Sequence, residues 1–420
     1  MKPLIALGLA VLCLCHGSFA GAGTAGEGAR MPAISKEQWR DDLRWFAREM
    51  PRRHKNLFHS MSREDFDRAV GELEAAIPNL EDHQIVVRLQ QILARVGDGH
   101  TGLHMPPWFQ LYPISLYWFG GELRVTAATK EYEHALGARV VRIGDLPIGE
   151  VDKRIRSCFP SAEAENEWYA LSTGPAFLTR PEVLHALGVI ADRARAPFTF
   201  EDDRGDTFVL ELKPIDTPRV ARGSVTIPGM LPVAPPPLFR QKPTERFWFE
   251  ALPDSTVYVC WRGYEGLGEQ AGKLFRHLDS HPVKRLVIDL RQNGGGDFLE
   301  GRTHVIRPLQ QREALNRRGR LFVIVGRRTY SAAMANAVDF RKDTNALLVG
   351  EPIGERPNSY SENDELTLPH SRLVVSYSTR YYQFVDEDVP AVLPDERIDP
   401  IWPEWRAGRD PVMDWILRQE

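Results

Sequence analysis

An apolar run passes directly into three consecutive glycines over residues 285–296, Arg285-Leu286-Val287-Ile288-Asp289-Leu290-Arg291-Gln292-Asn293-Gly294-Gly295-Gly296. A short apolar run that ends in a glycine-rich turn is typical of a buried strand followed by a loop. Glycines let the backbone approach a ligand closely and let N–H groups point outward, where they can stabilise an oxyanion. Glycines alone also occur in flexible turns and phosphate loops, but the Gly-Lys-Ser/Thr ending of a Walker-type loop is absent.

Strand and helix signals alternate on both sides of this run. The predicted elements are strands at 255–261, 321–325, 347–349 and 373–377, and helices at 270–279 and from about 298. Alternation of this kind is typical of an α/β layer structure. We therefore predict an α/β domain over residues 248–420.

A second informative loop follows the strand expected at 321–325. Its residues are Val325-Gly326-Arg327-Arg328-Thr329-Tyr330-Ser331-Ala332-Ala333-Met334-Ala335-Asn336. Ser331 would open a helix rich in small residues, and the N-terminus of a helix favours negative charge nearby. Serine is also a common helix cap, which is the structural alternative to a catalytic role. The Gly-x-Ser-x-Gly elbow of other hydrolases is absent.

Together, the two loops resemble a known family. The catalytic domain of tail-specific (C-terminal processing) serine peptidases is similar to three segments of this chain: the Asp-Leu-Arg-x-Asn-x-Gly-Gly pattern at 289–296, the Ser-Ala-Ala start of the helix at 331–333, and Gly-Glu-Pro at 350–352. The resemblance covers about 255–400, weakens over the N-terminus and is faint in the middle. It implies a catalytic domain with the layered β-α units of the ClpP/crotonase type. It also implies that this domain hydrolyses peptide bonds, with Ser331 as the nucleophile. The resemblance further implies an oxyanion hole of backbone N–H groups, one from Gly295 or Gly296 in the glycine turn and one from Ala332, with neither cofactor nor metal.

The general base distinguishes two branches of that family. One branch uses a lysine that follows the Gly-Glu-Pro segment, but Arg356 stands at that position here, and arginine cannot release its proton in a protein. The tricorn-like branch takes a histidine from an Asp-x-His-Thr segment near the N-terminus, which matches residues 98–101. Imidazole has the basicity that a serine proton requires. We therefore predict a Ser-His enzyme with His100 as the base, and His104 is a weaker candidate.

A third residue should orient the histidine. The tricorn-like branch uses a glutamate shortly before a Val-x-Pro-Asp segment, which matches residues 392–395 here. By spacing, Asp388 aligns best with that glutamate, Glu387 is adjacent, and Glu351 is a further alternative. A solvated acidic turn is the structural alternative. The serine that precedes the histidine in that branch is replaced by Gly99, so any role of that hydroxyl is lost.

Residues 1–20 have the features of a cleaved signal peptide. The apolar run at 4–15 is too short to span a bilayer comfortably, and residues 18–20 have the small-x-small form of a cleavage site. An uncleaved anchor and a lipoprotein are alternatives, although leucine stands where a lipoprotein would carry a small residue before Cys13 or Cys15. We expect an exported protein, periplasmic or secreted, with no membrane span after cleavage.

Residues 21–34 are rich in glycine and alanine and are predicted to be disordered. Amphipathic spacing predicts three helices over 35–105 as an N-terminal helical domain. Ser35 begins the first helix with a capping box, and Pro51 is expected to end it.

The middle of the chain predicts an α+β domain over 110–213, with strands interrupted by a helical insertion at about 162–195. It resembles the core of a PDZ-like domain, whose sheet edge can accept a peptide. The alternative is an α+β segment that is specific to this protein and only connects the two flanking domains. Residues 214–247 are Pro-rich and predict a linker. After signal cleavage only Cys158 and Cys260 would remain, either as one disulfide or as free thiols.

Composition narrows the class of protein. A chain of 420 residues suggests two or three domains, and a net charge of -4 gives no support for nucleic-acid binding. We expect a peptide or protein substrate, and the oligomeric state stays open. Two other functions remain in view. One is an inactive peptide-binding scaffold on the same fold, and the other is a crotonase-like acyl-CoA enzyme, against which export speaks.

Overall fold

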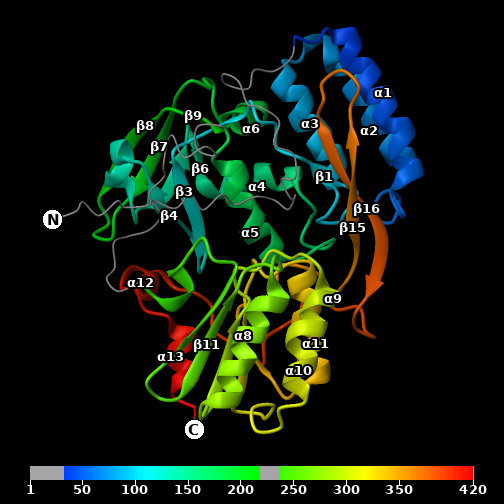
Figure 1. Ribbon diagram of the computed structural model, residues 1–420. Coiled ribbons are helices and arrows are strands. Elements are labelled where there is room, and N and C mark those ends of the chain that lie inside the picture. Colours follow the sequence, from blue (N-terminus) through cyan, green and yellow to red (C-terminus); the bar gives the residue numbers. More distant parts are fainter. Residues whose placement is uncertain (1–32, 218–235, 420) are drawn as a thin grey trace, which may run out of the picture. The chain divides into compact units, whose positions relative to one another are not determined.

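The computed structural model describes residues 33–217 and 236–419, which form two compact units (Figure 1). The described parts of the first unit are residues 33–164, 173–217 and 360–381. Those of the second unit are residues 165–172, 236–359 and 382–419. The predicted signal peptide, nearly all of the predicted disordered stretch and the centre of the Pro-rich segment lie outside the described residues.

The second unit is built on a six-stranded sheet. Its strands, in spatial order, are β10 (Phe247–Ala251), β11 (Thr256–Trp261), β12 (Arg285–Asp289), β13 (Leu321–Val325), β14 (Leu347–Gly350) and β17 (Glu396–Arg397). All neighbouring pairs are parallel except β10 with β11. This confirms the α/β architecture expected from the alternating signals.

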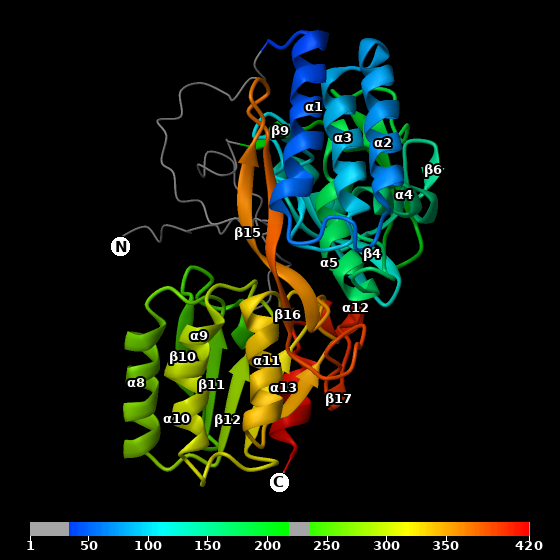
Figure 2. The ribbon, with the colours of Figure 1, turned by 90° about the vertical axis from the view of Figure 1, so that its right-hand side faces the viewer.

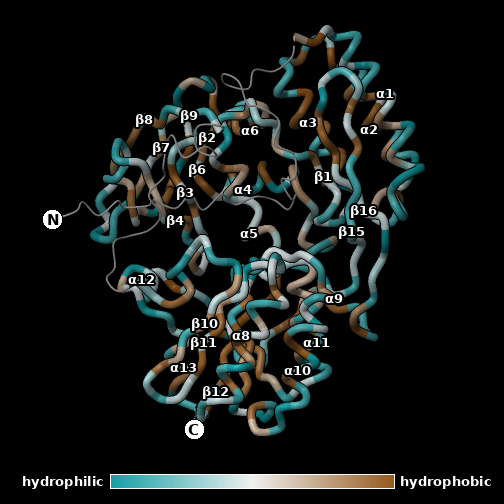
Figure 3. The backbone as a smooth tube through the Cα atoms, viewed as in Figure 1, coloured by the Kyte–Doolittle hydropathy of each residue, from teal (hydrophilic) through white to brown (hydrophobic). Residues whose placement is uncertain are grey.

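Alternate residues of these strands enter two separate cores. Val257, Val259 and Trp261 of β11 pack into one core, whereas Tyr258 and Cys260 pack into the other. This is the period of two that a strand buried on both faces requires. Figure 3 shows the hydrophobic colours following the strands and the inner faces of the flanking helices.

Helices cover both faces of this sheet (Figure 1). The larger core is closed by α8 (Leu267–Ser280), α11 (Ala332–Asp343) and the segment of α9 (Phe298–Gly301), a π-helix (Arg302–Ile306) and α10 (Arg307–Gln310). The smaller core is closed by α13 (Pro411–Leu417), and α12 (Trp402–Arg406) precedes it. The apolar residues of α8 recur at helical spacing, which explains why its inner face is buried.

The first unit begins with three helices, as expected. They are α1 (Lys36–Arg53), α2 (Arg63–Ala76) and α3 (Asp82–Ala94). The predicted capping box of Ser35 with Gln38 is present. The predicted stop at Pro51 is wrong, because α1 continues to Arg53 with Pro51 in its last turn. A proline there removes only one hydrogen bond near a helix end, where bonds are already incomplete.

An antiparallel sheet forms the rest of this unit. Its strands, in spatial order, are β3 (Ile114–Phe119), β4 (Glu122–Ala128), β5 (Arg139–Ile143), β7 (Ala196–Glu201) and β8 (Thr207–Leu212), with β6 (Leu146–Pro147) beside β5. Between β6 and β7 the chain forms α4 (Ile148–Ile155), α5 (Glu167–Leu178) and α6 (Pro181–Ala186), and the last two lie within the stretch of about 162–195 where helices were expected. The strand β9 (Ile215–Asp216) lies at the start of the predicted linker and pairs with β2 (Gln110–Leu111).

A long hairpin of β15 (Asn358–Thr367) and β16 (Val374–Gln383) belongs mostly to the first unit, although it comes from the predicted catalytic segment. It lies beside α1 (Figure 2), where buried Asp42 accepts N–H groups from His370 and Ser371 at 2.8 and 2.7 Å. The strand β16 also pairs with β1 (Gly102–Leu103). The hairpin therefore fixes the segment that follows α3.

Both cysteines of the described residues are buried free thiols, so the disulfide alternative is wrong. Burial raises the pKa of Cys158 and that of Cys260 to about 12. Among the described residues, no helix combines the length and the apolar character that crossing a bilayer requires.

Candidate active site

Ser331 lies on a sharp turn between a buried strand and a buried helix. The strand β13 ends at Val325, and α11 begins directly after Ser331. The Ser331 backbone has φ 54° and ψ −124°, a conformation that residues with a side chain rarely adopt. Its hydroxyl makes no cap hydrogen bond to α11, so the helix-cap interpretation is wrong. The turn thus has the strained strand-to-helix geometry of a nucleophile elbow without the Gly-x-Ser-x-Gly sequence.

Backbone strain of this kind costs about 1–3 kcal/mol and persists only where the surroundings enforce it. A carboxylate oxygen of Glu355 accepts the N–H of Ser331, and Glu355 is only 1% exposed. A hydrogen bond to a charged acceptor contributes about 1.5–3 kcal/mol, enough to offset the strain. Glu355 was not predicted from the sequence, because no motif singles it out.

The glycine loop packs directly on Ser331. A Cβ atom added to Gly295 would lie 2.7 Å from the Ser331 Cβ and 3.2 Å from its Oγ, and Gly295 has φ 112°. The two loops are also tied by hydrogen bonds. Thr329 Oγ1 donates to the Leu290 carbonyl at 2.9 Å, and the Tyr330 N–H donates to the Asn293 carbonyl at 3.0 Å. The two sequence motifs therefore form one site.

The three predicted oxyanion donors differ in their environment. The N–H of Gly295 donates to Asn293 Oδ1 at 3.0 Å and is engaged within the loop. Within the described parts of the chain, no acceptor pairs with the N–H of Gly296 or with that of Ala332. Ala332 is the first residue of α11, where the helix dipole adds positive potential. Of the three predicted donors, these two N–H groups are therefore the ones without an acceptor among the described residues.

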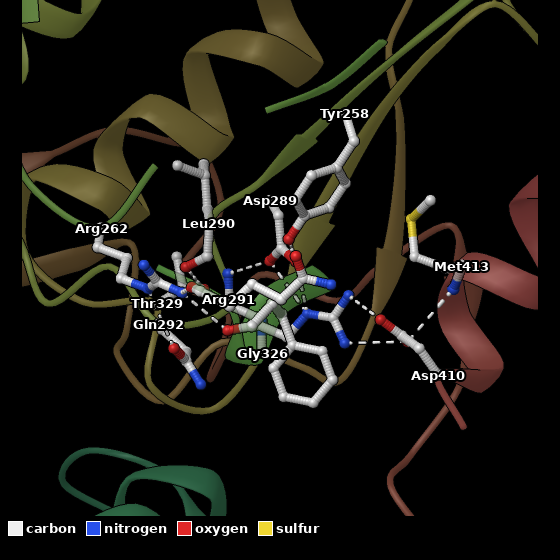
Figure 4. Close-up of polar contacts among 12 residues, drawn as sticks. Tyr258, Arg262, Asp289, Leu290, Arg291, Gln292, Gly326, Thr329, Asp410 and Met413 are labelled. Atoms are coloured by element: carbon white, nitrogen blue, oxygen red, sulfur yellow. Dashed lines mark hydrogen bonds and ion pairs between the residues drawn. The ribbon is translucent and has the colours of Figure 1, made fainter. Parts of the chain in front are cut away.

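The Asp-Leu-Arg part of the motif is a buried anchor rather than a catalytic group (Figure 4). Arg291 donates to Asp289 Oδ1 at 3.0 Å and forms a bidentate pair with Asp410, at 3.1 and 2.9 Å. Tyr258 donates its hydroxyl to Asp289 Oδ2 at 2.7 Å. Burial alone would lower the pKa of Arg291, but the two carboxylates raise it well above the ordinary value. Asp410 also caps α13 by accepting the N–H of Met413, so the anchor joins the glycine loop to the C-terminal helix.

The predicted orienting acids lie in the second unit. Asp388 pairs with Arg356 at 3.0 Å, and its side chain is 71% exposed. Glu387 contributes its backbone carbonyl, which accepts from the Asn358 amide at 3.1 Å. Glu351 forms a buried ion pair with Arg327, with Nε to Oε1 at 2.9 Å.

His100 lies in the first unit, on the turn after α3, and is held there by β16. Ser376 Oγ donates to the His100 carbonyl at 2.8 Å, and Ser378 Oγ donates to Asp98 Oδ1 at 2.8 Å. The His100 N–H donates to the same Asp98 oxygen at 3.1 Å. These serines are more than 270 positions from the turn, so no local pattern reveals their role.

The His100 ring is buried, and its Nε2 lies 3.3 Å from Ser361 Oγ. Burial lowers the pKa of His100 to about 4, although the charge of Asp98 opposes that shift. The neutral imidazole is therefore the form present at neutral pH, and it can accept a proton. His104, the weaker candidate, lies 3.8 Å from Glu365.

Asp98 is buried and turns its carboxylate toward another histidine. Its Oδ2 lies 2.9 Å from His54 Nε2, and His59 is 3.8 Å away. Burial would raise the pKa of Asp98, but the hydrogen bond with His54, the nearby His59 ring and the hydroxyl of Ser378 hold it well below the ordinary value. Asp98 thus orders the turn that carries His100.

Asp410→Asn should lower the free energy of unfolding by about 3–5 kcal/mol, because it leaves Arg291 buried without one of its counter-charges. Asparagine still caps α13, so the loss reports the charge pair. Urea denaturation measures the change. Asp399→Asn, in the exposed pair of Arg397 with Asp399, should change stability by less than about 1 kcal/mol. Equal effects of the two changes would contradict the assignment of an anchor.

Ser331→Gly should raise the free energy of unfolding by about 1 kcal/mol, because glycine adopts the Ser331 backbone angles without strain. Ser331→Ala keeps a Cβ atom and should change it by only a few tenths. Thermal and urea denaturation of the two variants side by side measure the difference. A destabilised glycine variant would show that the turn is not strained.

Comparison with known proteins yields a structural relationship only. No family model matches the chain, and no curated protein matches it. Mature CPAF superposes with a TM-score of 0.61 at 11% identity, over 91% of this chain and 96% of its own. CPAF complexed with lactacystin has a TM-score of 0.59, also at 11% identity, over 91% and 97%. The photosystem II D1 C-terminal processing protease matches 90% of this chain and 99% of its own at 14% identity, but its TM-score of 0.41 is too low to bear on the fold. The chain therefore has the mixed α/β fold of CPAF.

Proposed function

We propose that this chain is an exported serine peptidase with Ser331 as the nucleophile and His100 as the general base. The observation that carries the proposal is the strained turn at Ser331. The Ser331 hydroxyl makes no cap hydrogen bond to α11, and the side chain packs against the glycine loop. Strained backbone clusters at active sites, ligand clamps and switch regions, and Ser331 is one of five non-glycine residues with positive φ in the described parts of the chain. The fold shared with CPAF and the family resemblance of the two loops support the same conclusion.

In the proposed reaction His100 takes the proton of the Ser331 hydroxyl, and Ser331 Oγ attacks the carbonyl carbon of a peptide bond. The N–H groups of Gly296 and Ala332 stabilise the tetrahedral oxyanion. The protonated His100 then gives its proton to the leaving amine. Water, activated by the same imidazole, hydrolyses the acyl-enzyme and releases Ser331.

Two observations favour His100 as the general base: no lysine stands at the position used by the other branch, and a short segment of chain links a neighbour of Ser331 to a neighbour of His100. Arg356, at the lysine position of the other branch, is paired with Asp388 and cannot act as a base. Glu355, which binds the Ser331 N–H, and Ser361, which lies beside the His100 ring, are six residues apart in the sequence. Six residues span at most about 20 Å, so this short segment tethers a partner of the nucleophile to a partner of the base.

Asp388 and Glu387 are the acids that we propose to orient His100, as in the resemblance. Asp388 would have to leave its ion pair with Arg356 to do so, and its own side chain is 71% exposed, whereas that of Arg356 is 18% exposed. The substrate we propose is a peptide or protein. The antiparallel sheet of the first unit is the proposed PDZ-like peptide-binding element.

Ser331→Ala and His100→Asn should each lower peptide hydrolysis by at least about three orders of magnitude. His104→Asn is the matched control and should retain activity. A fluorophosphonate probe should label the parent chain at Ser331, and His100→Asn should slow the labelling. An inactive scaffold would resist the probe, and a crotonase-like enzyme would instead be retained on immobilised CoA. Labelling unaffected by His100→Asn would exclude that histidine as the base.

The pH profile should report the buried environment of His100. Because burial lowers the pKa of His100 to about 4, the base form is present above that pH and is lost as the pH falls through it. We therefore expect kcat/KM to hold from neutral pH to about pH 5 and to fall with a midpoint near pH 4. Circular dichroism at each pH separates this loss from acid unfolding. A midpoint near the ordinary histidine value of about 6.5 would contradict the assigned environment.

A further inference from the structure

Two histidines from different helices of the first unit meet away from the proposed active site. His83 lies on α3 and His185 on α6, and they are 102 positions apart in the sequence. Their facing nitrogens, His83 Nε2 and His185 Nδ1, are 2.9 Å apart. His83 is 2% exposed, whereas His185 is half-buried and reaches the surface.

An acidic side chain completes the cluster. Glu81, which immediately precedes α3, places Oε2 3.8 Å from His83 Nδ1. One possible ligand atom from each of Glu81, His83 and His185 lies within 4.8 Å of the others. The Glu81 carboxylate is more than half exposed and is paired with Arg193 at 3.0 Å. The exposed ion pair with Arg193 is weak, and Glu81 also takes part in a capping box with Gln84 at the start of α3.

The surroundings of His83 favour its neutral form. Burial lowers the pKa of His83 to about 3, and the positive charge of Arg193 lowers it further in the same direction. The His83 ring is therefore neutral at neutral pH. Neutral imidazole is the commonest protein ligand for transition metals.

We propose that His83, His185 and Glu81 form a binding site for a divalent transition-metal ion of the Zn²⁺ type. Zinc binds histidine nitrogen at about 2.0–2.1 Å, so two nitrogens on one tetrahedral ion are separated by about 3.3 Å. The observed 2.9 Å requires a shift of only a few tenths of an ångström. Glu81 lies beside the other ring nitrogen of His83, so its carboxylate must leave Arg193 and turn toward Nε2 before it can supply an oxygen. Water fills the remaining position. The ion would clamp α3 to α6.

The metal-binding proposal does not depend on the proposed peptidase activity. The two sites are nevertheless connected through α3. The helix α3 ends at Ala94 and leads into the turn that carries His100. A clamp on α3 would therefore stabilise the support of that turn. The simpler alternative is a hydrogen bond between two neutral rings, which predicts no dependence on metal.

The experiment uses the full chain without a histidine tag, stripped with a chelator and then titrated with Co²⁺, whose visible absorption reports tetrahedral nitrogen and oxygen ligands. Zn²⁺ is then added to displace it. We expect one equivalent to bind with these bands and Zn²⁺ to raise the melting temperature. His185→Gln and His83→Gln should each weaken binding at least about tenfold. Arg193→Gln should tighten binding, because it removes a positive charge and frees Glu81.

Two matched substitutions serve as controls. His134→Gln changes an exposed histidine of the same unit, and His281→Gln breaks the stacked His277–His281 pair, whose rings are 4.2 Å apart. Both should bind Co²⁺ as the parent does. His185 is only partly buried, so its variant should fold normally, and circular dichroism checks this for each variant. The proposal is overturned if the parent takes up no stoichiometric ion, if His185→Gln binds undiminished, or if only His281→Gln loses the ion.

Discussion

The backbone of Ser331 is the constraint on which the proposed active site depends. A residue with a side chain is held at positive φ between a buried strand and a buried helix, and the conformation survives because both sides of it are occupied. Glu355 binds its N–H from one direction, and Gly295 packs on its side chain from another. A side chain at Gly295 would collide with Ser331, so the glycine pattern of the first loop follows from the position of the serine in the second.

The rest of the second unit supports this contact. The parallel strands bring the glycine loop and the Ser331 loop to the same edge of the sheet, because each follows the carboxyl end of its strand. Arg291 then anchors the first loop to the C-terminal helix through two buried carboxylates. A buried charge cluster of this kind is costly to break and therefore fixes the loop in one position.

His100 is supported by a different and more distant part of the chain. Its turn is bonded to Ser376 and Ser378 of β16, and its ring lies beside Ser361 of β15. The hairpin therefore carries residues of the C-terminal third into the first unit. For this reason the sequence pattern predicts consecutive domains, whereas the contacts within the chain group it into two units, each made of several separate segments of the sequence. The sequence around His100 therefore gives no sign of the distant hairpin residues that contact it.

The sequence by itself determined the alternating strands and helices, the helical N-terminus and the two loops of the proposed site, because apolar periodicity and glycine are local signals. It also predicted Ser331 and His100 as the pair to test. Only the tertiary structure decided that Ser331 is strained rather than a helix cap, that Glu355 binds its N–H, and that His83 meets His185. Each of these depends on contacts between residues far apart in the chain, and a single sequence does not encode such contacts in a readable spacing.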